Sequence, residues 1–394
     1  MRRIGIFGGS FNPIHSGHLL AMDVFRRELF LDSLLVIPAG IPPHKQLAEN
    51  SPEADVRFRL TAAAASELPW TEVLDLELKR KGKSYSIDTV MELHRLYPGD
   101  RLFLLMGTDM FLSFEQWYRF EELLKLCELG VICRYDADEQ SNREIQTLAA
   151  SFSDKYGAKI HIIKSEHIEL SSTQVRRMLF FGCGEQYLPQ PIRPMIRENG
   201  YYAAKNCKAL SLDELTRRVA MLYDPKRFTH AVGCAQTAVT LARRYGADAD
   251  NAARAGILHD ITKALRGKDQ FALCERFGIP CLKQCVPDVL HGYTAAAAAR
   301  EIFGENEDVC SAIYWHTTGH GNMTILEKIL YLADYMEPNR DFEEVHTLRD
   351  LAENDLDKAL LYGLELSIRD LTRRGKIIDP NSAEAYEFLK SERI

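Results

Sequence analysis

A glycine-rich segment with two histidines is the first part of the sequence whose residue types could do chemistry. Residues 8–18 read GGSFNPIHSGH and follow a short apolar run, Ile4–Phe7. Glycines let a backbone approach a phosphate closely, and the N-terminus of a following helix offers free N–H groups and a positive dipole end. His15 and His18 would add hydrogen-bond donors. Such an arrangement would suit transfer at a nucleotide α-phosphate, where a protein mainly positions the reactants and stabilises charge.

A second group of residues is suited to binding metal. The C-terminal half carries four histidines and two aspartates on, or at the ends of, segments with helical periodicity. These residues are His230, His259, Asp260, His291, His316 and Asp334. Imidazoles and carboxylates bind first-row metals such as iron, manganese and zinc. A carboxylate such as that of Asp260 can bridge two metals, and metal activation of water is one route to cleaving a phosphate bond.

The first half of the chain alternates strand-like with helix-like segments. The short apolar runs are Ile4–Phe7, Leu34–Pro38, Arg101–Met106, Leu129–Cys133 and Lys159–Ile163. The segments with helical periodicity between them are Gly17–Leu29, Ala54–Leu68, Ile87–Leu96 and Phe120–Leu126. Short apolar strands separated by helices predict βαβ units and an α/β fold with a doubly wound, buried parallel sheet.

This alternation stops near residue 200, and the rest of the chain has helical periodicity. The segments concerned are Ala231–Tyr245, Asn251–Leu265, Tyr293–Phe303, Asp308–His316 and Ile325–Met336. We therefore expect two domains, residues 1–203 and residues 210–394, of which the second is an all-α bundle. Some apolar helix surface in the second domain would be either core or the face of a homodimer, and the sequence does not separate these alternatives.

Composition and charge exclude several classes of protein. Of the 394 residues, 46% are apolar and 27% are charged, which is typical of a globular protein, and a formal net charge of −7 argues against a general nucleic-acid binder. No window approaches the apolar length that crosses a bilayer, and the N-terminus lacks the features of a signal peptide. The nine cysteines form no CxxC pair, which favours buried thiols in a reducing compartment. We expect a cytoplasmic protein without nucleic-acid or membrane partners.

Residues 8–18 resemble the signature of the HxGH nucleotidyltransferases, and further segments narrow the resemblance to the bacterial (NadD-like) nicotinate-nucleotide adenylyltransferases. These segments are IPPHK at 41–45, SYSIDT at 84–89, GTD at 107–109 with Trp117 after it, and LSSTQVR at 170–176. The resemblance covers residues 1 to about 202 and implies a Rossmann-like fold. It also implies transfer of AMP from ATP, accompanied by Mg²⁺, to nicotinate mononucleotide, which gives deamido-NAD and pyrophosphate.

The same resemblance implies the site residues of the first domain. The catalytic residues would be His15, His18 and Lys45. ATP would be bound by Gly8, Gly9, Ser10, Phe11, His15, His18, Asp109, Ser171, Ser172, Thr173 and Arg176. The pyridine nucleotide would be bound by Asn12, Lys45, Ser84, Tyr85, Ser86, Trp117 and Arg134. Trp117 would stack on the pyridine ring, and residues 84–86 would hold its carboxylate. Ser86 stands where the family usually has threonine, so the hydroxyl is kept and a methyl group is lost.

The histidines and aspartates of the second half resemble the pattern of the HD phosphohydrolase superfamily. Three surrounding segments are similar to its YqeK-type subfamily: LHDITK at 258–263, HTTG at 316–319 and ADYMEPNR at 333–340. This resemblance covers roughly residues 210–390. It implies symmetrical hydrolysis of diadenosine tetraphosphate to two ADP, with one or two iron or manganese ions.

By this second resemblance, the expected metal ligands are His230, His259, Asp260 and Asp334. His291 and His316 would bind a second metal or the phosphate chain, and Asp260 and Lys263 would be catalytic. The substrate would be bound by Lys263, His291, His316, Thr317, Asn339 and Arg340.

Two other functions for the second domain stay open. It could hydrolyse another nucleotide, such as a guanosine alarmone, or it could bind a nucleotide only as a regulator of an active transferase. For the first domain, pantetheine-phosphate and cytidylyl transfer use the same fold. The PPHK and SYSIDT segments and Trp117 favour the pyridine nucleotide over those substrates.

Overall fold

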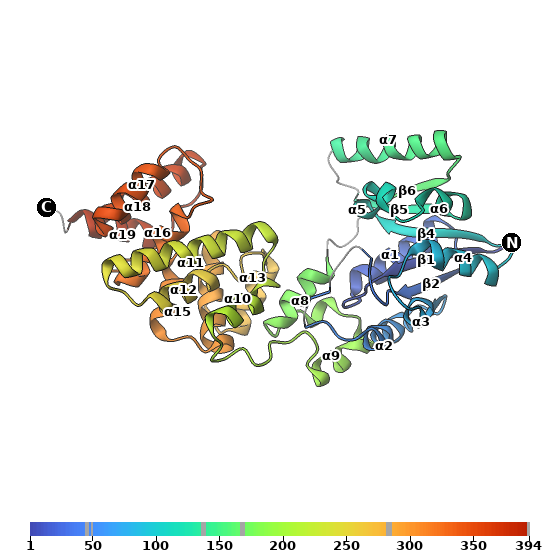
Figure 1. Cartoon of the computed structure of the whole chain (residues 1–394), viewed down its shortest axis with the longest axis horizontal. Helices are drawn as coiled ribbons and strands as arrows, with labels where there is room; N and C mark the ends of the chain where they lie inside the picture. The colour runs from blue at the N-terminus through green and yellow to red at the C-terminus, as the bar shows by residue number, and fades with distance from the viewer. Residues whose placement is uncertain (44–46, 49, 135–138, 166–169, 281–285, 392–394) are drawn as a thin grey trace. The chain divides into compact units, whose positions relative to one another are not determined.

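A computed structural model describes residues 1–43, 47–48, 50–134, 139–165, 170–280 and 286–391, with the side chain of Arg134 outside this description. The chain divides into two compact units (Figure 1). The first unit contains residues 1–179 and 184–202, and the second contains residues 180–183 and 203–394.

The first unit is built around a six-stranded parallel sheet. Its strands are β1 (Arg3–Gly9), β2 (Ser33–Pro38), β3 (Thr71–Val73), β4 (Arg101–Gly107), β5 (Glu128–Arg134) and β6 (Ile160–Ser165). Their order is β3-β2-β1-β4-β5-β6, which confirms the predicted doubly wound α/β fold. The apolar runs predict five strands and do not include β3, because its three residues are too few to give an apolar run.

Helices flank this sheet. They are α1 (Ser16–Glu28), α2 (Ala54–Ala65), α3 (Leu76–Lys79), α4 (Ser86–Leu96), α5 (Thr108–Leu112), α6 (Phe120–Leu126), α7 (Glu139–Tyr156), α8 (Ser172–Phe180) and α9 (Arg193–Asn199). Three single 3-10 turns join them: η1 (Phe114–Gln116), η2 (Glu185–Tyr187) and η3 (Gln190–Ile192). The four predicted helices correspond to α1, α2, α4 and α6, whereas α7, a largely polar helix, was not predicted.

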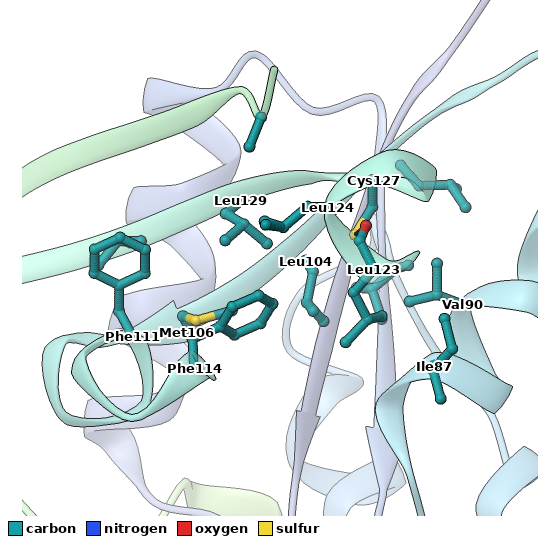
Figure 2. Packing of buried hydrophobic residues seen from close by; sticks show 14 of the residues in the cluster. Ile87, Val90, Leu104, Met106, Phe111, Phe114, Leu123, Leu124, Cys127 and Leu129 are labelled. Atoms are coloured by element: carbon teal, nitrogen blue, oxygen red, sulfur yellow. Dashed lines mark hydrogen bonds between the residues drawn. The ribbon is translucent and has the colours of Figure 1, made fainter. Parts of the chain in front are cut away.

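The main core of the first unit lies on one face of the sheet. Figure 2 shows Leu104 and Met106 of β4 among side chains from α4 and α6, such as Val90 and Leu123. Neighbouring residues of a strand face opposite sides of a sheet, so Leu105 belongs to the other face. These buried strands explain the nearly continuous apolar runs in the sequence, because both faces of the sheet are covered.

The second unit is helical, as predicted. Its helices are α10 (Leu212–Ala220), α11 (Pro225–Tyr245), α12 (Ala249–Leu258), α13 (Lys268–Arg276), α14 (Leu290–Ala298), α15 (Glu307–Trp315), α16 (Ile325–Met336), α17 (Val345–Asn354), α18 (Leu356–Arg373) and α19 (Pro380–Ser391), with short turns η4 (Pro287–Val289) and η5 (Ala299–Phe303). Side-chain caps fix several of the helix starts. Asp224 accepts the N–H of Arg227 at the start of α11, and Thr324 and Glu327 form a capping box on α16.

One predicted helix is shorter than expected. The periodicity of Asn251–Leu265 predicted a continuous helix, but α12 ends at Leu258 and the chain then turns. His259 and Asp260 therefore lie at a helix end, where two adjacent side chains can face one site. Within the described parts of the chain, the seven cysteines are free thiols, and no helix has the length and apolar character needed to cross a membrane.

Candidate functional site

The glycine-rich turn of the first unit connects β1 to α1 at the carboxyl edge of the sheet. A Cβ atom at Gly8, the penultimate residue of β1, or at Gly107, the last residue of β4, would meet no atom within 4 Å. Both strand ends therefore face open space. The strand order reverses between β1 and β4, and open parallel sheets bind nucleotides at such a switch point.

His15 and His18 lie together at the start of α1. Their ring centroids are 3.7 Å apart, and the N–H of His15 donates to Nδ1 of His18 at 3.1 Å. Since this nitrogen accepts a hydrogen bond, neutral His18 carries its proton on Nε2. Burial lowers the pKa of His18 to about 4, and burial together with the neighbouring His18 lowers the pKa of His15 to about 2. Both imidazoles are therefore neutral hydrogen-bonding groups near pH 7.

The first turn of α8 is tied to the same loop. Ser172 Oγ donates to the carbonyl of Pro13 at 3.0 Å, and Arg176 Nη1 donates to the carbonyl of Asn12 at 2.6 Å. Arg176 also donates to Thr173 Oγ1 at 3.0 Å. The glycine-rich loop and the start of α8 are more than 150 residues apart in the sequence. These hydrogen bonds bring them together in one site.

A second side of this unit gathers aromatic rings at the start of α4. Tyr85 precedes α4, and its ring centroid lies 4.8 Å from that of Tyr118. The adjacent Trp117 is half-buried, with its ring 5.0 Å from Phe114. The structure therefore brings the SYSIDT segment beside the Trp117 segment. The first N–H groups of a helix have no partner within the helix, so the start of α4 can donate to an anion.

Six side chains converge inside the second unit. They are His230 from α11, His259 and Asp260 after α12, His291 from α14, His316 after α15 and Asp334 from α16. Within this set, three overlapping groups of three residues have ligand atoms within 4.8 Å of one another. The atoms that are buried without a hydrogen bond are His230 Nε2, His259 Nε2, Asp260 Oδ1, His291 Nε2 and His316 Nε2. Imidazole nitrogens and carboxylate oxygens that converge on one another and make no hydrogen bond fit a divalent metal ion.

Asp260 lies at the centre of this cluster and is fully buried. Its nearest ion-pair partners are Arg227 at 2.6 Å, Lys263 at 3.2 Å, His291 at 3.3 Å, and His259 and His316 at 3.6 Å each. Burial alone would raise the pKa of Asp260, but neighbouring His259 and Lys263 hold it well below its ordinary value. Asp260 is therefore a carboxylate that can face metal on one side and cations on the other.

A cavity of about 520 Å³ opens beside the cluster. His316, Thr317 and Asp334 line one part of it, and the Oγ1 of Thr317 is buried without a hydrogen bond. Arg340 also lines the cavity and donates to Asp334 Oδ1 at 2.8 Å. The aromatic ring of Tyr335 contributes an apolar wall. The cavity thus combines a cation, a hydroxyl and an aromatic surface next to the metal-binding donors.

The two halves of the chain match different protein families. Residues 6–178 match the cytidylyltransferase-like family, and residues 227–339 match the HD domain family. A probable nicotinate-nucleotide adenylyltransferase of Geobacter metallireducens is 34% identical over 218 residues, which cover 51% of this chain and 98% of that relative. A relative with the same description from Shewanella pealeana is 36% identical over 210 residues, covering 51% of this chain and 95% of the relative.

The first half of the chain belongs to the nicotinate-nucleotide adenylyltransferase family. The second half contains an HD domain. A crystal structure of a predicted HD superfamily hydrolase involved in NAD metabolism, from Clostridium acetobutylicum, is 37% identical to this chain. It covers 46% of this chain and 98% of its own, with a TM-score of 0.45.

In the adenylyltransferase-family half, the structure gathers most predicted ATP-binding residues at the switch point. Asp109 is exposed near the end of β4, and Ser171 Oγ accepts the N–H of Gln174 at the start of α8. Some predicted side chains have structural partners instead. The ring of Phe11 is buried, Asn12 Nδ2 donates to Ser51 at 2.7 Å, and Ser84 Oγ accepts the N–H of Gly40 at 3.1 Å. Lys45 and the side chain of Arg134 lie outside the described residues.

In the HD half, the structure brings all six predicted metal-binding residues together. Lys263 contacts Asp260, and Thr317 and Arg340 line the cavity. Asn339 is not among the residues that line the cavity, and its side chain donates to Glu337 Oε2 at 2.8 Å.

Three residues with contacts in these sites were not predicted. Arg57 is 1% exposed and donates to the carbonyls of Ser10, Ala39 and Gly40. Arg227 contacts Asp260, and Glu337 accepts a hydrogen bond from His230. The spacing of Arg227, one helical turn before His230, could have indicated its position. Nothing in the sequence signalled the roles of Arg57 and Glu337, because their partners are distant along the chain.

Proposed function

We propose that this chain is a bifunctional cytoplasmic enzyme with one active site in each unit. The first unit would transfer AMP from ATP to nicotinate mononucleotide, and the second would hydrolyse diadenosine tetraphosphate to two ADP. Free thiols in the described residues are compatible with a reducing compartment.

The observation that carries the transferase proposal is the joined pair of phosphate-binding segments. Hydrogen bonds from Ser172 and Arg176 hold the start of α8 against Asn12 and Pro13 of the glycine-rich loop. Two helix N-termini, α1 and α8, are thereby fixed near the open ends of β1 and β4. This arrangement supports binding of a triphosphate, because both helix ends offer N–H groups to anions.

The reaction would be direct attack at phosphorus. A phosphate oxygen of the mononucleotide would form a bond to the α-phosphorus of ATP, and the bond from that phosphorus to pyrophosphate would break. Mg²⁺ would enter with ATP as part of the substrate. His18 would donate its Nε2 proton in a hydrogen bond to the phosphoryl oxygens, and His15 would hold His18 in that tautomer through its N–H. Lys45 and Arg134 would contact phosphate.

The choice of nicotinate is supported by the start of α4. Tyr85 precedes that helix and Ser86 is its first residue. The N–H groups and the helix dipole at this end favour a carboxylate over a neutral amide. Trp117 would stack on the pyridine ring. The relatives named as probable nicotinate-nucleotide adenylyltransferases agree with this choice.

The transferase proposal is tested by measuring pyrophosphate release from ATP with nicotinate mononucleotide or with nicotinamide mononucleotide. We expect kcat/KM to be at least about tenfold higher with the nicotinate, which corresponds to about 1.4 kcal/mol of discrimination. Equal rates with the two mononucleotides would contradict the role proposed for the start of α4. If neither mononucleotide led to pyrophosphate release, the proposed transferase activity would be wrong.

The hydrolase proposal is supported by the buried imidazole nitrogens and carboxylate oxygen that converge around Asp260 without hydrogen bonds. His230, His259, Asp260 and Asp334 would hold one iron or manganese ion, and His291 and His316 would hold a second ion or the phosphate chain. A bound ion supplies Lewis-acid activation of phosphate and of water. Lys263 and Arg340 would neutralise charge on the phosphate chain.

The adjacent cavity supports a nucleotide as the substrate. Its Thr317 hydroxyl and Arg340 guanidinium suit phosphate oxygens, and the ring of Tyr335 suits a base or ribose. We favour diadenosine tetraphosphate over a guanosine alarmone because of the HTTG and ADYMEPNR segments. A purely regulatory role is less well supported, since a binding module would not need all six converging donors.

Product analysis separates these alternatives. The full chain would be incubated with diadenosine tetraphosphate and, in turn, Fe²⁺, Mn²⁺, Co²⁺ and Zn²⁺. Two ADP are expected. Release of AMP and ATP would contradict symmetrical cleavage, and binding without cleavage under any metal would favour the regulatory alternative.

A further inference from the structure

Glu337 is a buried carboxylate beside the metal-binding cluster but outside its set of six donors. It follows the last residue of α16 and is 1% exposed. Its Oε1 atom lies 3.1 Å from Nδ1 of His230. Its Oε2 atom accepts the backbone N–H of Asn339 at 2.7 Å and the side-chain amide of Asn339 at 2.8 Å. Both carboxylate oxygens are therefore engaged, and one of them is directed at a single imidazole.

His230 is the exception among the four clustered histidines. The other three direct Nδ1 at a carbonyl three residues earlier in their own helix or turn. These contacts are His259 to Gly256 at 2.8 Å, His291 to Asp288 at 2.9 Å and His316 to Ile313 at 2.7 Å. Only His230 uses a side-chain carboxylate for this contact, and that carboxylate is 107 residues away.

Gly233 leaves the space that Glu337 occupies. It lies in α11 one turn after His230, and a Cβ atom there would be 2.5 Å from Glu337 Oε2 and 3.3 Å from Asn339 Nδ2. Glycine inside a helix is less stable than alanine. This glycine is therefore explained by the close approach of Glu337.

The backbone around Glu337 is also held in place. Arg349 donates to the carbonyls of Met336 and Glu337 at 2.9 Å each and to that of Arg340 at 3.1 Å. The carboxylate thus approaches His230 from a fixed segment, while His230 Nε2 lies 3.0 Å from Asp334 Oδ1 on the cluster side.

We propose that Glu337 is a positioning residue that accepts the Nδ1 proton of His230 and so presents the Nε2 lone pair to a metal ion. Gly233 is the small residue that this contact requires. A carboxylate behind a ligating imidazole fixes the ring and its tautomer and makes it a stronger ligand. The inference rests on the proposed metal-dependent function of the second unit.

The first test measures Mn²⁺ affinity of the full chain by titration calorimetry, together with the visible spectrum of the Co²⁺ form and the melting temperature without metal. Glu337→Gln should weaken Mn²⁺ binding ~10–100-fold and change the Co²⁺ spectrum. Glu305→Gln is the matched control, because Glu305 is also a buried carboxylate but pairs with Arg254 at 2.6 Å. It should lower the melting temperature and leave Mn²⁺ affinity unchanged.

The second test combines Gly233→Ala with Glu337→Ala. Gly233→Ala alone should weaken Mn²⁺ binding, although alanine favours the helix. In the Glu337→Ala background the space is free, so adding Gly233→Ala should cause no further loss. Equal losses in both backgrounds would contradict the assigned role of Gly233.

The outcomes also separate this inference from the function on which it rests. If the wild-type chain binds Mn²⁺ and Glu337→Gln binds it equally well, the positioning role is wrong while the metal site stands. If the wild-type chain binds neither Mn²⁺ nor Co²⁺, the proposed metal-dependent function is wrong. The positioning role of Glu337 is then wrong as well.

Discussion

At the scale of single residues, the first site depends on imidazoles that stay neutral. Burial and the neighbouring His18 lower the pKa of His15 to about 2, far below the value of about 6.5 in an unfolded chain. Between these values the unfolded chain binds the extra proton, so stability is complete above about pH 6.5 and decreases as the pH falls. A lowered histidine pKa therefore makes the folded first unit sensitive to mild acid.

This linkage gives a prediction for His15. Lowering the pH from 7.5 to 5 should cost the first unit about 2 kcal/mol through His15 alone, and His15→Asn should remove that part of the loss. Urea unfolding would be followed through Trp70 and Trp117 in a Trp315→Phe background, which confines the signal to the first unit. If wild type and His15→Asn lost the same stability, the burial of a neutral His15 would be disproved.

Arg57 gives a second residue-scale prediction. Its guanidinium donates to the carbonyls of Ser10 at 2.6 Å, Ala39 at 2.8 Å and Gly40 at 3.0 Å, which ties the glycine-rich loop to the segment that follows β2. Arg57→Lys keeps the charge but cannot make all three contacts. It should lower the free energy of unfolding by about 2 kcal/mol and raise KM for ATP.

Arg59 is the matched control for Arg57. It lies on the same helix, is exposed and pairs only with Asp55 among the contacts of the described chain. Arg59→Lys should change the free energy of unfolding by less than about 0.5 kcal/mol and leave KM for ATP unaltered. An equal effect of both substitutions would show that the loop contacts of Arg57 have no special role.

At the scale of elements, two of the three glycines of β1 have different roles. A Cβ at Gly5 would be 2.7 Å from Leu31 and 3.1 Å from Leu105, two buried side chains, whereas a Cβ at Gly8 would meet nothing within 4 Å. Gly5→Ala should destabilise the first unit by about 1–2 kcal/mol and preserve kcat of the folded protein. Gly8→Ala should leave stability within about 0.5 kcal/mol but raise KM for ATP about tenfold, because the methyl group enters the proposed phosphate site.

Urea unfolding and pyrophosphate-release kinetics on the two alanine variants would check this prediction. Loss of stability in Gly8→Ala would mean that the space beside β1 is occupied by the protein itself. Normal ATP kinetics in a folded Gly8→Ala protein would place the phosphates elsewhere.

The strands and helices also show which features could be predicted from the sequence. Apolar runs predicted five of the six strands, since a sheet covered on both faces needs continuous apolar residues, but β3 has too few residues to be recognised. The clustering of His230 with Asp334 followed from a family pattern. The contact of Glu337 with His230 could not be predicted, because it depends on how α11 and the end of α16 pack. Local sequence contains no information about such a distant pair.

At the scale of the whole molecule, the chain crosses between the units more than once. Helix α8 begins in the first unit with the predicted ATP-binding residues, yet residues 180–183 belong to the second unit. Phe180 contributes to the second unit through ring contacts with Phe181 at 5.3 Å and Phe303 at 6.2 Å. Each proposed site nevertheless draws all of its described residues from one unit, so the two activities should be separable by substitution in the intact chain.

His18→Ala should reduce pyrophosphate release from ATP and nicotinate mononucleotide at least about 100-fold, because it removes the Nε2 donor, and should leave diadenosine tetraphosphate hydrolysis intact. Asp260→Asn should have the opposite effect, and asparagine is preferable to alanine because it fills the buried position next to Arg227 and Lys263. Both activities would be assayed on the same preparation, with circular dichroism to verify folding. Loss of both activities in either folded variant would contradict independent sites. It would show instead that the two activities depend on each other.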